Sequence, residues 1–139
     1  MISRPVPRRF LLLLPLVALA GCTPAGNTGV DTGRFKGDQK AVAQAVSDLS
    51  DAASHKDGKR ACAQVLSSAL TDKLGPNCAN VMKDQFDDAD SFKLDVQSIS
   101  VSGDTATARV SSDVNGNKRP ATLSLKRENG RWRVAGLGG

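Results

Sequence analysis

The amino-acid sequence predicts an α+β domain in which about three N-terminal helices pack on a curved four-strand antiparallel sheet. Three observations lead to this prediction. Apolar residues recur at helical spacing over residues 38–86, they alternate with polar residues from Ser91 onward, and turn residues separate the alternating segments. A chain of 139 residues has room for one modest core of this kind.

The first helix is expected to begin at Asp38, whose side chain is a suitable N-cap. Its buried stripe comprises Val42, Val46, Leu49 and Ala53. The only histidine, His55, falls on the opposite, polar face of this helix. We therefore predict that His55 lies in solvent. Because the chain has no second histidine, we also predict that it is not a general base or a metal ligand.

Two further helices are expected, the second from about Lys59 to Leu74 and the third beginning after the cap residue Asn77. Turn signals at Asp57-Gly58 and Gly75-Pro76 separate them. The second helix is predicted to bury Cys62, Val65, Leu66 and Ala69. The third is predicted to bury Cys78, Val81, Met82 and Phe86.

The sheet is expected to be a meander of four strands. The first alternates as far as Val96 and then changes phase at Ile99, which predicts a bulge near Gln97-Ser98. Turns are predicted at Gly103-Asp104, Asn115-Gly116 and Asn129-Gly130. Inward rows are expected to contain Phe92, Leu94, Val96, Ala106, Ala108, Val110, Ala121, Leu123, Leu125, Trp132 and Val134. Trp132 is therefore predicted to be a core residue.

The N-terminus has the pattern of an export signal, with basic residues, an apolar run over residues 10–20 and small residues before a cysteine. The run is about half as long as a membrane-spanning helix of ~20 residues. The sequence Leu19-Ala20-Gly21-Cys22 resembles the lipobox of bacterial lipoproteins in every position. The resemblance implies cleavage before Cys22 and attachment of a diacylglyceryl group to its thiol. Arg8-Arg9 leaves the choice between general secretory and twin-arginine export open.

The resemblance divides the chain into a signal peptide (1–21), a lipidated N-terminus with a flexible linker (22–37) and one domain (38–139). The linker is expected because residues 23–37 are rich in Gly and Thr and have little apolar periodicity. Two acyl chains hold a protein stably on a bilayer. We therefore expect a lipid-anchored protein on the extracytoplasmic face of the cell membrane.

Once Cys22 is assigned to the lipid, Cys62 and Cys78 are an even pair in an oxidising compartment, which predicts one structural disulfide. A loop of this length contributes about 3 kcal/mol when it is closed. Buried free thiols and a redox pair are the alternatives. The spacing of the two cysteines is not that of a C-x-x-C redox motif, and two ligands do not complete a zinc site.

Domain residues 38–137 resemble the nuclear-transport-factor-like or cystatin-like cone fold found in many small exported bacterial proteins. The resemblance is carried by DGKRACAQVLSSAL, NGNKRPATLSLKRENG and RWRVAGL. It implies the fold and leaves the function open. Enzymes with this fold, such as ketosteroid isomerases and polyketide cyclases, use a carboxylate or histidine base in the cone and often a tyrosine.

No such catalytic set is evident in this chain, which has no tyrosine. Asp95 and Asp113 are the nearest acidic candidates, but both fall on predicted polar rows of the sheet. We therefore expect no catalytic residues, metal site or cofactor. The expected function is a non-catalytic binding or interaction module of the envelope, with a protein or a small apolar ligand as its partner. A cone enzyme of the isomerase or cyclase type is the alternative, and a purely structural envelope protein is a third possibility.

The formal charge of +5 falls when the signal peptide is removed, which leaves 16 basic and 14 acidic residues. These charges are interspersed and lack neighbouring aromatic residues, so nucleic-acid binding is not expected. The pairs Lys118-Arg119, Lys126-Arg127 and Arg131/Arg133 are candidates for a basic patch on the last two strands. A charged, solvated sheet face is the alternative interpretation of the same residues.

Overall fold

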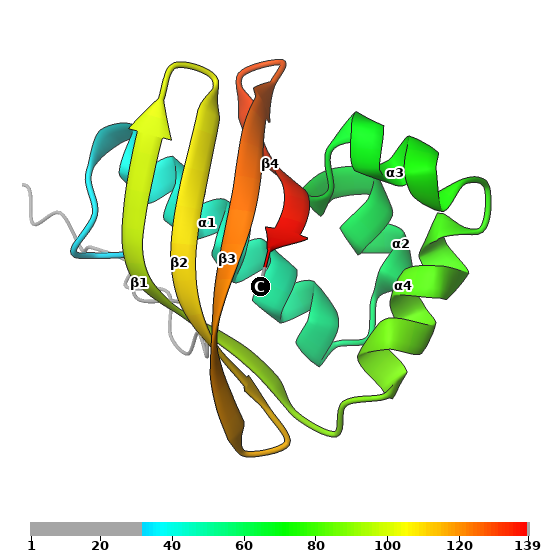
Figure 1. The fold of residues 1–139 in the computed structure, drawn as a ribbon. Helices are drawn as coiled ribbons and strands as arrows, with labels where there is room; N and C mark the ends of the chain where they lie inside the picture. Colours follow the sequence, from blue (N-terminus) through cyan, green and yellow to red (C-terminus); the bar gives the residue numbers. More distant parts are fainter. Residues whose placement is uncertain (1–31, 139) are drawn as a thin grey trace, which may run out of the picture.

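The computed structural model describes residues 32–138, which form a layer of helices on one face of a four-strand sheet (Figure 1). The helices precede the strands along the chain, so the predicted α+β class is confirmed. The predicted signal peptide, the lipobox with Cys22 and residues 23–31 of the expected linker lie outside the described residues.

Helix α1 (Gly37–Ser54) runs along the inner face of the sheet (Figure 1). It begins one residue before the expected Asp38, which instead places its carboxylate in the first turn, where the helix dipole favours negative charge. The predicted stripe is buried, because its four members, Val42, Val46, Leu49 and Ala53, are at most 4% exposed. His55 follows the helix with 71% of its side chain exposed, as predicted.

The prediction of one continuous second helix from about Lys59 to Leu74 is wrong. The segment forms a short helix α2 (Gly58–Arg60), one π-helical turn η1 (Ala61–Val65) and, after a break, helix α3 (Ser68–Leu74). Ala69, which was expected to be buried, is exposed in α3.

The break has a tertiary cause. Leu66 adopts an extended conformation and forms a parallel β-bridge with Val134. The backbone N–H of Ser67 donates to the carbonyl of Val134 at 2.8 Å. The hydroxyl of Ser67 then accepts a hydrogen bond from the N–H of Leu70 and so caps α3. A hydrogen bond to the last strand therefore replaces helical bonds that the local sequence would allow.

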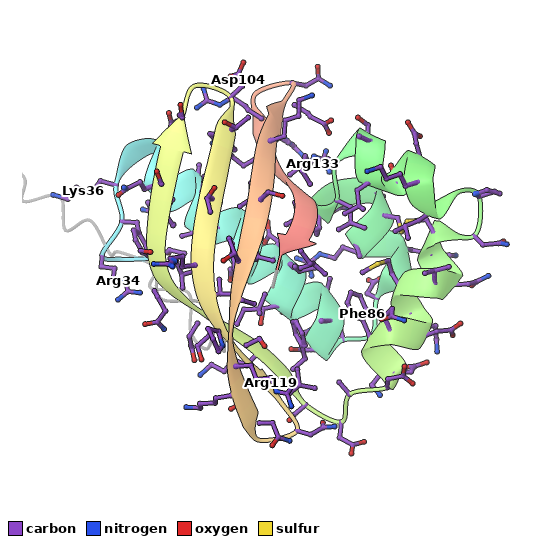
Figure 2. All side chains as sticks on the ribbon, viewed as in Figure 1. Arg34, Lys36, Phe86, Asp104, Arg119 and Arg133 are labelled. Atoms are coloured by element: carbon purple, nitrogen blue, oxygen red, sulfur yellow. A yellow bond between two sulfur atoms is a disulfide. The ribbon has the colours of Figure 1, made fainter. Side chains whose placement is uncertain are left out.

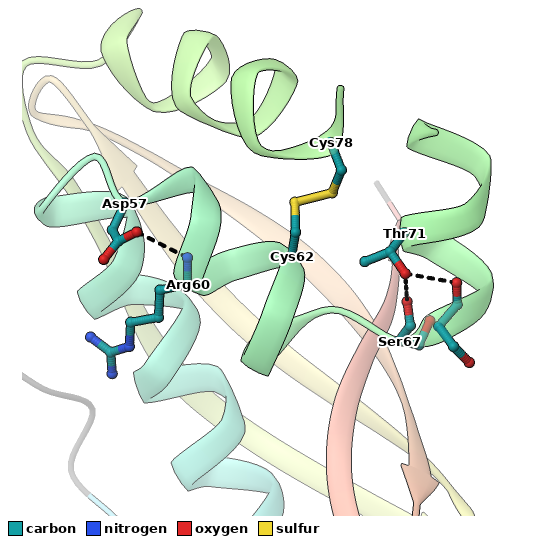
Figure 3. Close-up of a disulfide and its surroundings, with 7 residues drawn as sticks. Asp57, Arg60, Cys62, Ser67, Thr71 and Cys78 are labelled. Carbon is teal, nitrogen blue, oxygen red and sulfur yellow. Dashed lines mark hydrogen bonds between the residues drawn. A yellow bond between two sulfur atoms is a disulfide. The ribbon is translucent and has the colours of Figure 1, made fainter. Parts of the chain in front are cut away.

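Helix α4 (Cys78–Asp87) is joined to η1 by the disulfide Cys62–Cys78, as Figure 3 shows. The two Cα atoms lie 6.2 Å apart, and the predicted pairing is present. Phe86 is buried, whereas Val81, which was predicted to lie on the same face, is 36% exposed. Around the axis of α4, Val81 lies roughly 100° from the centre of the stripe formed by residues 78, 82 and 86. Its side chain is therefore at the side of the helix and is not covered by the core.

Four strands form the predicted meander, in the order β1-β2-β3-β4 with antiparallel neighbours. They are β1 (Phe92–Ser102), β2 (Thr105–Val114), β3 (Asn117–Glu128) and β4 (Arg131–Gly138). The predicted bulge is present, since the register of β1 shifts between Val96 and Ser98. A second shift between Ser124 and Leu125, opposite β4, was not predicted.

The core lies between α1 and the inner face of this sheet. Every strand contributes a buried row. Phe92 and Ala121, which were predicted to face inward, are only partly buried. The other predicted inward residues are at most 7% exposed, namely Leu94, Val96, Ala106, Ala108, Val110, Leu123, Leu125, Trp132 and Val134. Trp132 is thus a core residue, as predicted. Because the core is contained between Phe35 and Val134, residues 32–139 should fold without the preceding segment.

Side chains from the region of α1 occupy the outer edge of β1. Arg34 donates from its guanidinium to the carbonyl of Val96, and Gln39 donates to the carbonyl of Ile99 at 3.2 Å. Phe35 packs partly buried against the core. Contacts with the domain therefore begin within the segment that was expected to be a linker.

Gly58 lies where α2 approaches α4 most closely. A β-carbon at this position would lie 2.0 Å from the carbonyl oxygen of Ala79 and 2.8 Å from the backbone nitrogen of Lys83. Both neighbours are backbone atoms, which do not move aside as a flexible side chain would. The predicted helix break at Asp57-Gly58 thus has a packing role, and the Asp57 carboxylate caps α2 by accepting from the N–H of Arg60 at 2.9 Å.

We expect Gly58→Ala to destabilise the domain by about 3 kcal/mol or more, because α2 must separate from α4 to admit the methyl group. Thermal unfolding of the two proteins under oxidising conditions measures the effect. Gly103→Ala is the control for glycine removal, since a β-carbon there meets no atom within 4 Å and only backbone strain at its φ of 58° applies. Equal losses of stability in the two variants would contradict the packing explanation.

Candidate ligand-binding site

Side chains fill the interior of the cone in the part of the chain that the structure describes. Val42 and Val46 of α1 belong to the same core cluster as Val110, Leu123 and Val134 of the sheet, and each of these residues is at most 2% exposed. The centre of the cone between α1 and the sheet is therefore occupied by the protein's own side chains. Clefts that solvent reaches lie at the margin of this core.

The inner face continues past the core at the β2–β3 hairpin. Pairing between β3 and β4 reaches only to Thr122 and Gly138, so the first residues of β3 have no neighbour on the β4 side. Ser112 pairs with Arg119, and Val114 pairs with Asn117. These four residues are in phase with the buried Val110 and Leu123, which places them on the inner face.

Together with Asn115, these four residues line a cleft of about 420 Å³, which we call the hairpin cleft. Figure 2 shows Arg119 on the arm of the sheet that extends away from the helices. The lining provides a hydroxyl, two amides, a guanidinium and an apolar valine side chain. Clefts that fix the orientation of a small ligand combine apolar surface with a few polar groups of these types.

The turn at the end of the hairpin is held in place by hydrogen bonds to the start of β1. Asn115 has a positive φ of 54° and is followed by Gly116 with a φ of 80°, which is the conformation of the predicted Asn-Gly turn. The side-chain oxygen of Asn115 accepts from the N–H of Ser91 at 3.0 Å. The backbone N–H of Asn115 donates to the carbonyl of Ser91 at 3.1 Å. The Asn115 NH₂ group remains available to a ligand.

Arg119 is the charged group of the hairpin cleft. It is exposed, and it forms neither an ion pair nor a hydrogen bond with any residue in the described range. A guanidinium presents a planar set of donors that matches planar acceptors and also stacks on flat rings. The hairpin cleft therefore has an unused donor suited to a planar, oxygen-bearing ligand.

A second cleft, of about 310 Å³, lies between α1 and the β3–β4 turn and is lined in part by Gln44, Gln64, Asp48 and Trp132. Two of its lining side chains, Asp48 and Trp132, already interact with other residues of the protein. Asp48 lies 3.8 Å from the guanidinium of Arg60, and the ring of Trp132 is 7% exposed with Arg127 over one face at 4.7 Å. Trp132 therefore does not offer an open face for stacking.

The two acidic candidates from the sequence lie on the outer face of the sheet, away from the hairpin cleft. Asp113 is opposite Lys118 in the β2–β3 register, and the carboxylate of Asp95 lies 3.7 Å from the ammonium of Lys93. This matches their expected place on the polar rows. Within residues 32–138, no group of three or more His, Cys, Asp or Glu residues is placed to hold a metal ion.

Arg127 differs from the expected basic patch, because its side chain points inward. Its guanidinium forms an ion pair with Asp38 of α1 at 2.7 Å and lies over Trp132. The sequence carried a signal for this arrangement, since Arg127 is in phase with the buried Leu123 and Leu125. Arg127 thus links the last two strands to the start of α1.

The architecture, with helices followed by a curled antiparallel sheet, is that of NTF2-like proteins. A solved structure of a variant of Rd1NTF2_05 is similar to this chain, with a TM-score of 0.56 and 12% sequence identity over 73% of this chain and 98% of that chain. A de novo designed NTF2 fold protein, NT-9, is 18% identical over 70% of this chain and 80% of its own, with a TM-score of 0.41. At these identities the likeness is one of fold alone.

Residues 32–136 match the family described as "Putative lumazine-binding", and the chain belongs to this family. The matched range coincides with the folded domain and includes every residue of the hairpin cleft. No curated protein matches this chain. Among residues 32–138, no helix has both the length and the apolar character needed to cross a bilayer.

Ionisable groups with clearly shifted pKa values lie outside the hairpin cleft. The hydroxyl and the backbone N–H of Ser68 both donate to the carboxylate of Glu128, and these bonds lower the pKa of Glu128. On α4, the ammonium of Lys83 bonds to Asp87 and lowers the pKa of that carboxyl group. Both carboxylates stabilise helical segments, and neither is placed to exchange protons with a ligand in the hairpin cleft.

Glu128 holds the first turn of α3 against β3, and we expect Glu128→Gln to cost about 0.5–1 kcal/mol at neutral pH. Folding lowers the pKa of Glu128 below its ordinary value of 4.5. The carboxylate therefore stabilises the domain above pH 4.5, and this stabilisation is lost as the pH falls through the pKa of the folded state. The difference between the two proteins should therefore shrink in acid. Denaturant unfolding at pH 7 and near pH 3 measures it, and a difference independent of pH would contradict the assignment.

Proposed function

We propose that this protein is a lipid-anchored, extracytoplasmic binding module whose hairpin cleft takes a small, planar, polar heterocycle of the lumazine class. The observation that carries the proposal is the unpaired Arg119 beside two amides and a hydroxyl, on the inner face of a domain whose family is described as lumazine-binding. The occupant is a small molecule, in line with one of the two partners expected from the sequence.

Lumazine is a flat bicyclic pteridine with two carbonyl groups and ring nitrogens. Its carbonyl oxygens require donors, which the Arg119 guanidinium and the Asn117 amide supply at the cleft. Val114 offers an apolar contact for the ring, and a guanidinium can stack on its face. A fully apolar ligand, which the sequence suggested, fits less well because the apolar interior is already occupied by side chains.

The proposal includes no catalytic step. General acid–base chemistry requires a titratable group within reach of the substrate. The hairpin cleft is lined by serine, valine, asparagine and arginine, and no carboxylate, histidine, cysteine or lysine is among its lining residues. The alternative, an enzyme of the isomerase or cyclase type, would need an inward carboxylate. Asp38, in the first turn of α1, is not such a group, because its side chain is 57% exposed and ion-paired with Arg127.

Anchorage rests on the lipobox Leu19-Ala20-Gly21-Cys22 and on its distance from the domain. Nine residues lie between Cys22 and the first residue of the family match, Thr32. We expect the Gly- and Thr-rich linker to span on the order of 20 Å, which sets the mean distance between the domain and the headgroups. The lipid determines where the module works, whereas the hairpin cleft determines what it binds.

We expect lumazine to bind residues 32–139 at the hairpin cleft. Arg119→Gln should raise the dissociation constant roughly tenfold, because a hydrogen bond from a charged donor is lost. Isothermal titration calorimetry with lumazine measures both values. Arg119→Lys retains the charge without the planar donors and should fall between the wild type and Arg119→Gln.

The matched control is Arg131→Gln, which removes an arginine that is also exposed and unpaired within the described residues but lies at the start of β4, opposite Glu128 at the far end of β3. This variant should bind lumazine as the wild type does. If wild-type protein binds no lumazine, or if both arginine variants lose affinity equally, the hairpin cleft is not the site.

The anchor is tested separately with Cys22→Ser in the full chain, expressed in a bacterium with a lipoprotein-processing pathway. We expect loss of lipid attachment and accumulation of uncleaved precursor, because the serine hydroxyl does not accept the diacylglyceryl group. Metabolic labelling with a fatty acid and fractionation of membranes measure the outcome. Labelling of the variant at the wild-type level would contradict the assignment of Cys22.

A further inference from the structure

The two layers of the domain carry opposite net charge. Residues 37–90, which contain the helices, include nine acidic and six basic residues. Residues 91–138, which contain the sheet, include eight basic and four acidic residues. The near-neutral total charge of the domain therefore hides a separation between a basic sheet and an acidic helical layer. A molecule with this separation becomes oriented in the field of a charged surface.

Most of the basic residues of the sheet lie on its outer face, which we call the basic face. Strand alternation places six cations there, namely Lys93, Arg109, Lys118, Lys126, Arg131 and Arg133. Four of them, Arg109, Lys118, Lys126 and Arg131, form no ion pair or hydrogen bond within residues 32–138. Their charge is therefore available to an external partner.

Carboxylates on the basic face lie at its two ends. Asp95 and Asp113 are at the hairpin end, where Asp95 is paired with Lys93. Glu128 is at the opposite end and is held by Ser68. Between them, hydroxyl residues surround Arg109, which pairs with Ser98 and Thr122 on the neighbouring strands. The centre of the face is thus cationic and bordered by neutral hydroxyl side chains.

The basic face has no protein layer over it in the described part of the chain. Figure 1 shows α1 behind the sheet and the other helices to one side, so the opposite surface of the strands faces solvent. The first described residues also lie at the sheet, because Arg34 donates to the carbonyl of Val96 on the edge strand β1. The N-terminal end of the described residues therefore contacts the edge of this sheet.

We propose that the basic face docks on an anionic lipid headgroup surface and holds the domain with its sheet toward the bilayer and its acidic helices away from it. The six cations are distributed over all four strands, an arrangement that fits a plane of negative charge better than a single anion. Each lysine or arginine close to an anionic bilayer favours binding by about 1 kcal/mol, which is roughly fivefold in affinity. The cellular role of this contact rests on the proposed anchor, but the contact itself needs no lipid on Cys22.

The test uses residues 32–139, which contain the complete core, with vesicles of equal parts phosphatidylglycerol and phosphatidylcholine at low salt. We expect co-sedimentation with these vesicles, loss of binding at high salt, and no binding to pure phosphatidylcholine. Combining Arg109→Gln with Lys126→Gln should weaken binding by about twenty-five-fold. The charge-preserving pair Arg109→Lys with Lys126→Arg should bind as the wild type does, because the attraction depends on charge and not on donor geometry.

The matched control combines Lys59→Gln with Lys73→Gln, which removes the same charge from two exposed lysines of the helical layer. We expect this pair to weaken binding by less than threefold. Equal losses in the two pairs would show that only net charge matters and would overturn the docking face. Binding to dextran sulfate without binding to the anionic vesicles would overturn it in favour of a polysaccharide partner. Fatty-acid labelling of Cys22 in the full chain is independent of all these results, so the anchor and the docking face can fail separately.

Discussion

The packing of α1 against the inner face of the sheet is the contact on which the other features depend. Its buried stripe meets rows from all four strands, and these residues make up most of the core. Because α1 already fills the cone, the remaining helices are arranged around its margin and need a disulfide and a close glycine contact to stay in place. The same packing occupies the centre of the cone with the protein's own side chains and leaves the hairpin arm as a part of the inner face that solvent reaches.

The start of α1 is held to the sheet by charge as well as by packing. Arg127 connects Asp38 with the ring of Trp132, so the first turn of the helix, β3 and β4 meet at one guanidinium. Bonds from Arg34 and Gln39 occupy carbonyls on the edge of β1. These contacts lie at opposite edges of the sheet and fix the helix across its full width. An isolated exposed ion pair contributes little, but a partly buried guanidinium that also packs on an aromatic ring contributes more.

Local patterns were sufficient to predict the strands, because alternation and turn residues are properties of neighbouring positions. The bulge at Val96/Ser98 and the Asn115-Gly116 turn were predicted for this reason. The break at Leu66-Ser67 was not predicted, since it depends on a hydrogen bond to Val134, which is far away in sequence. The hairpin cleft was missed for a related reason. It exists because β4 pairs only as far as Thr122, and strand length is set by tertiary contacts and by the bulge at Ser124/Leu125.

The short reach of β4 also has a consequence for aggregation. It leaves the beginning of β3 as an open strand edge, and such edges are templates on which a second chain adds a strand. Pro120 lies in the middle of this stretch and has no N–H to donate, and the charged pair Lys118-Arg119 precedes it. Both features disfavour pairing with another strand. The residues that line the hairpin cleft are thus part of an arm that resists self-association through β-pairing.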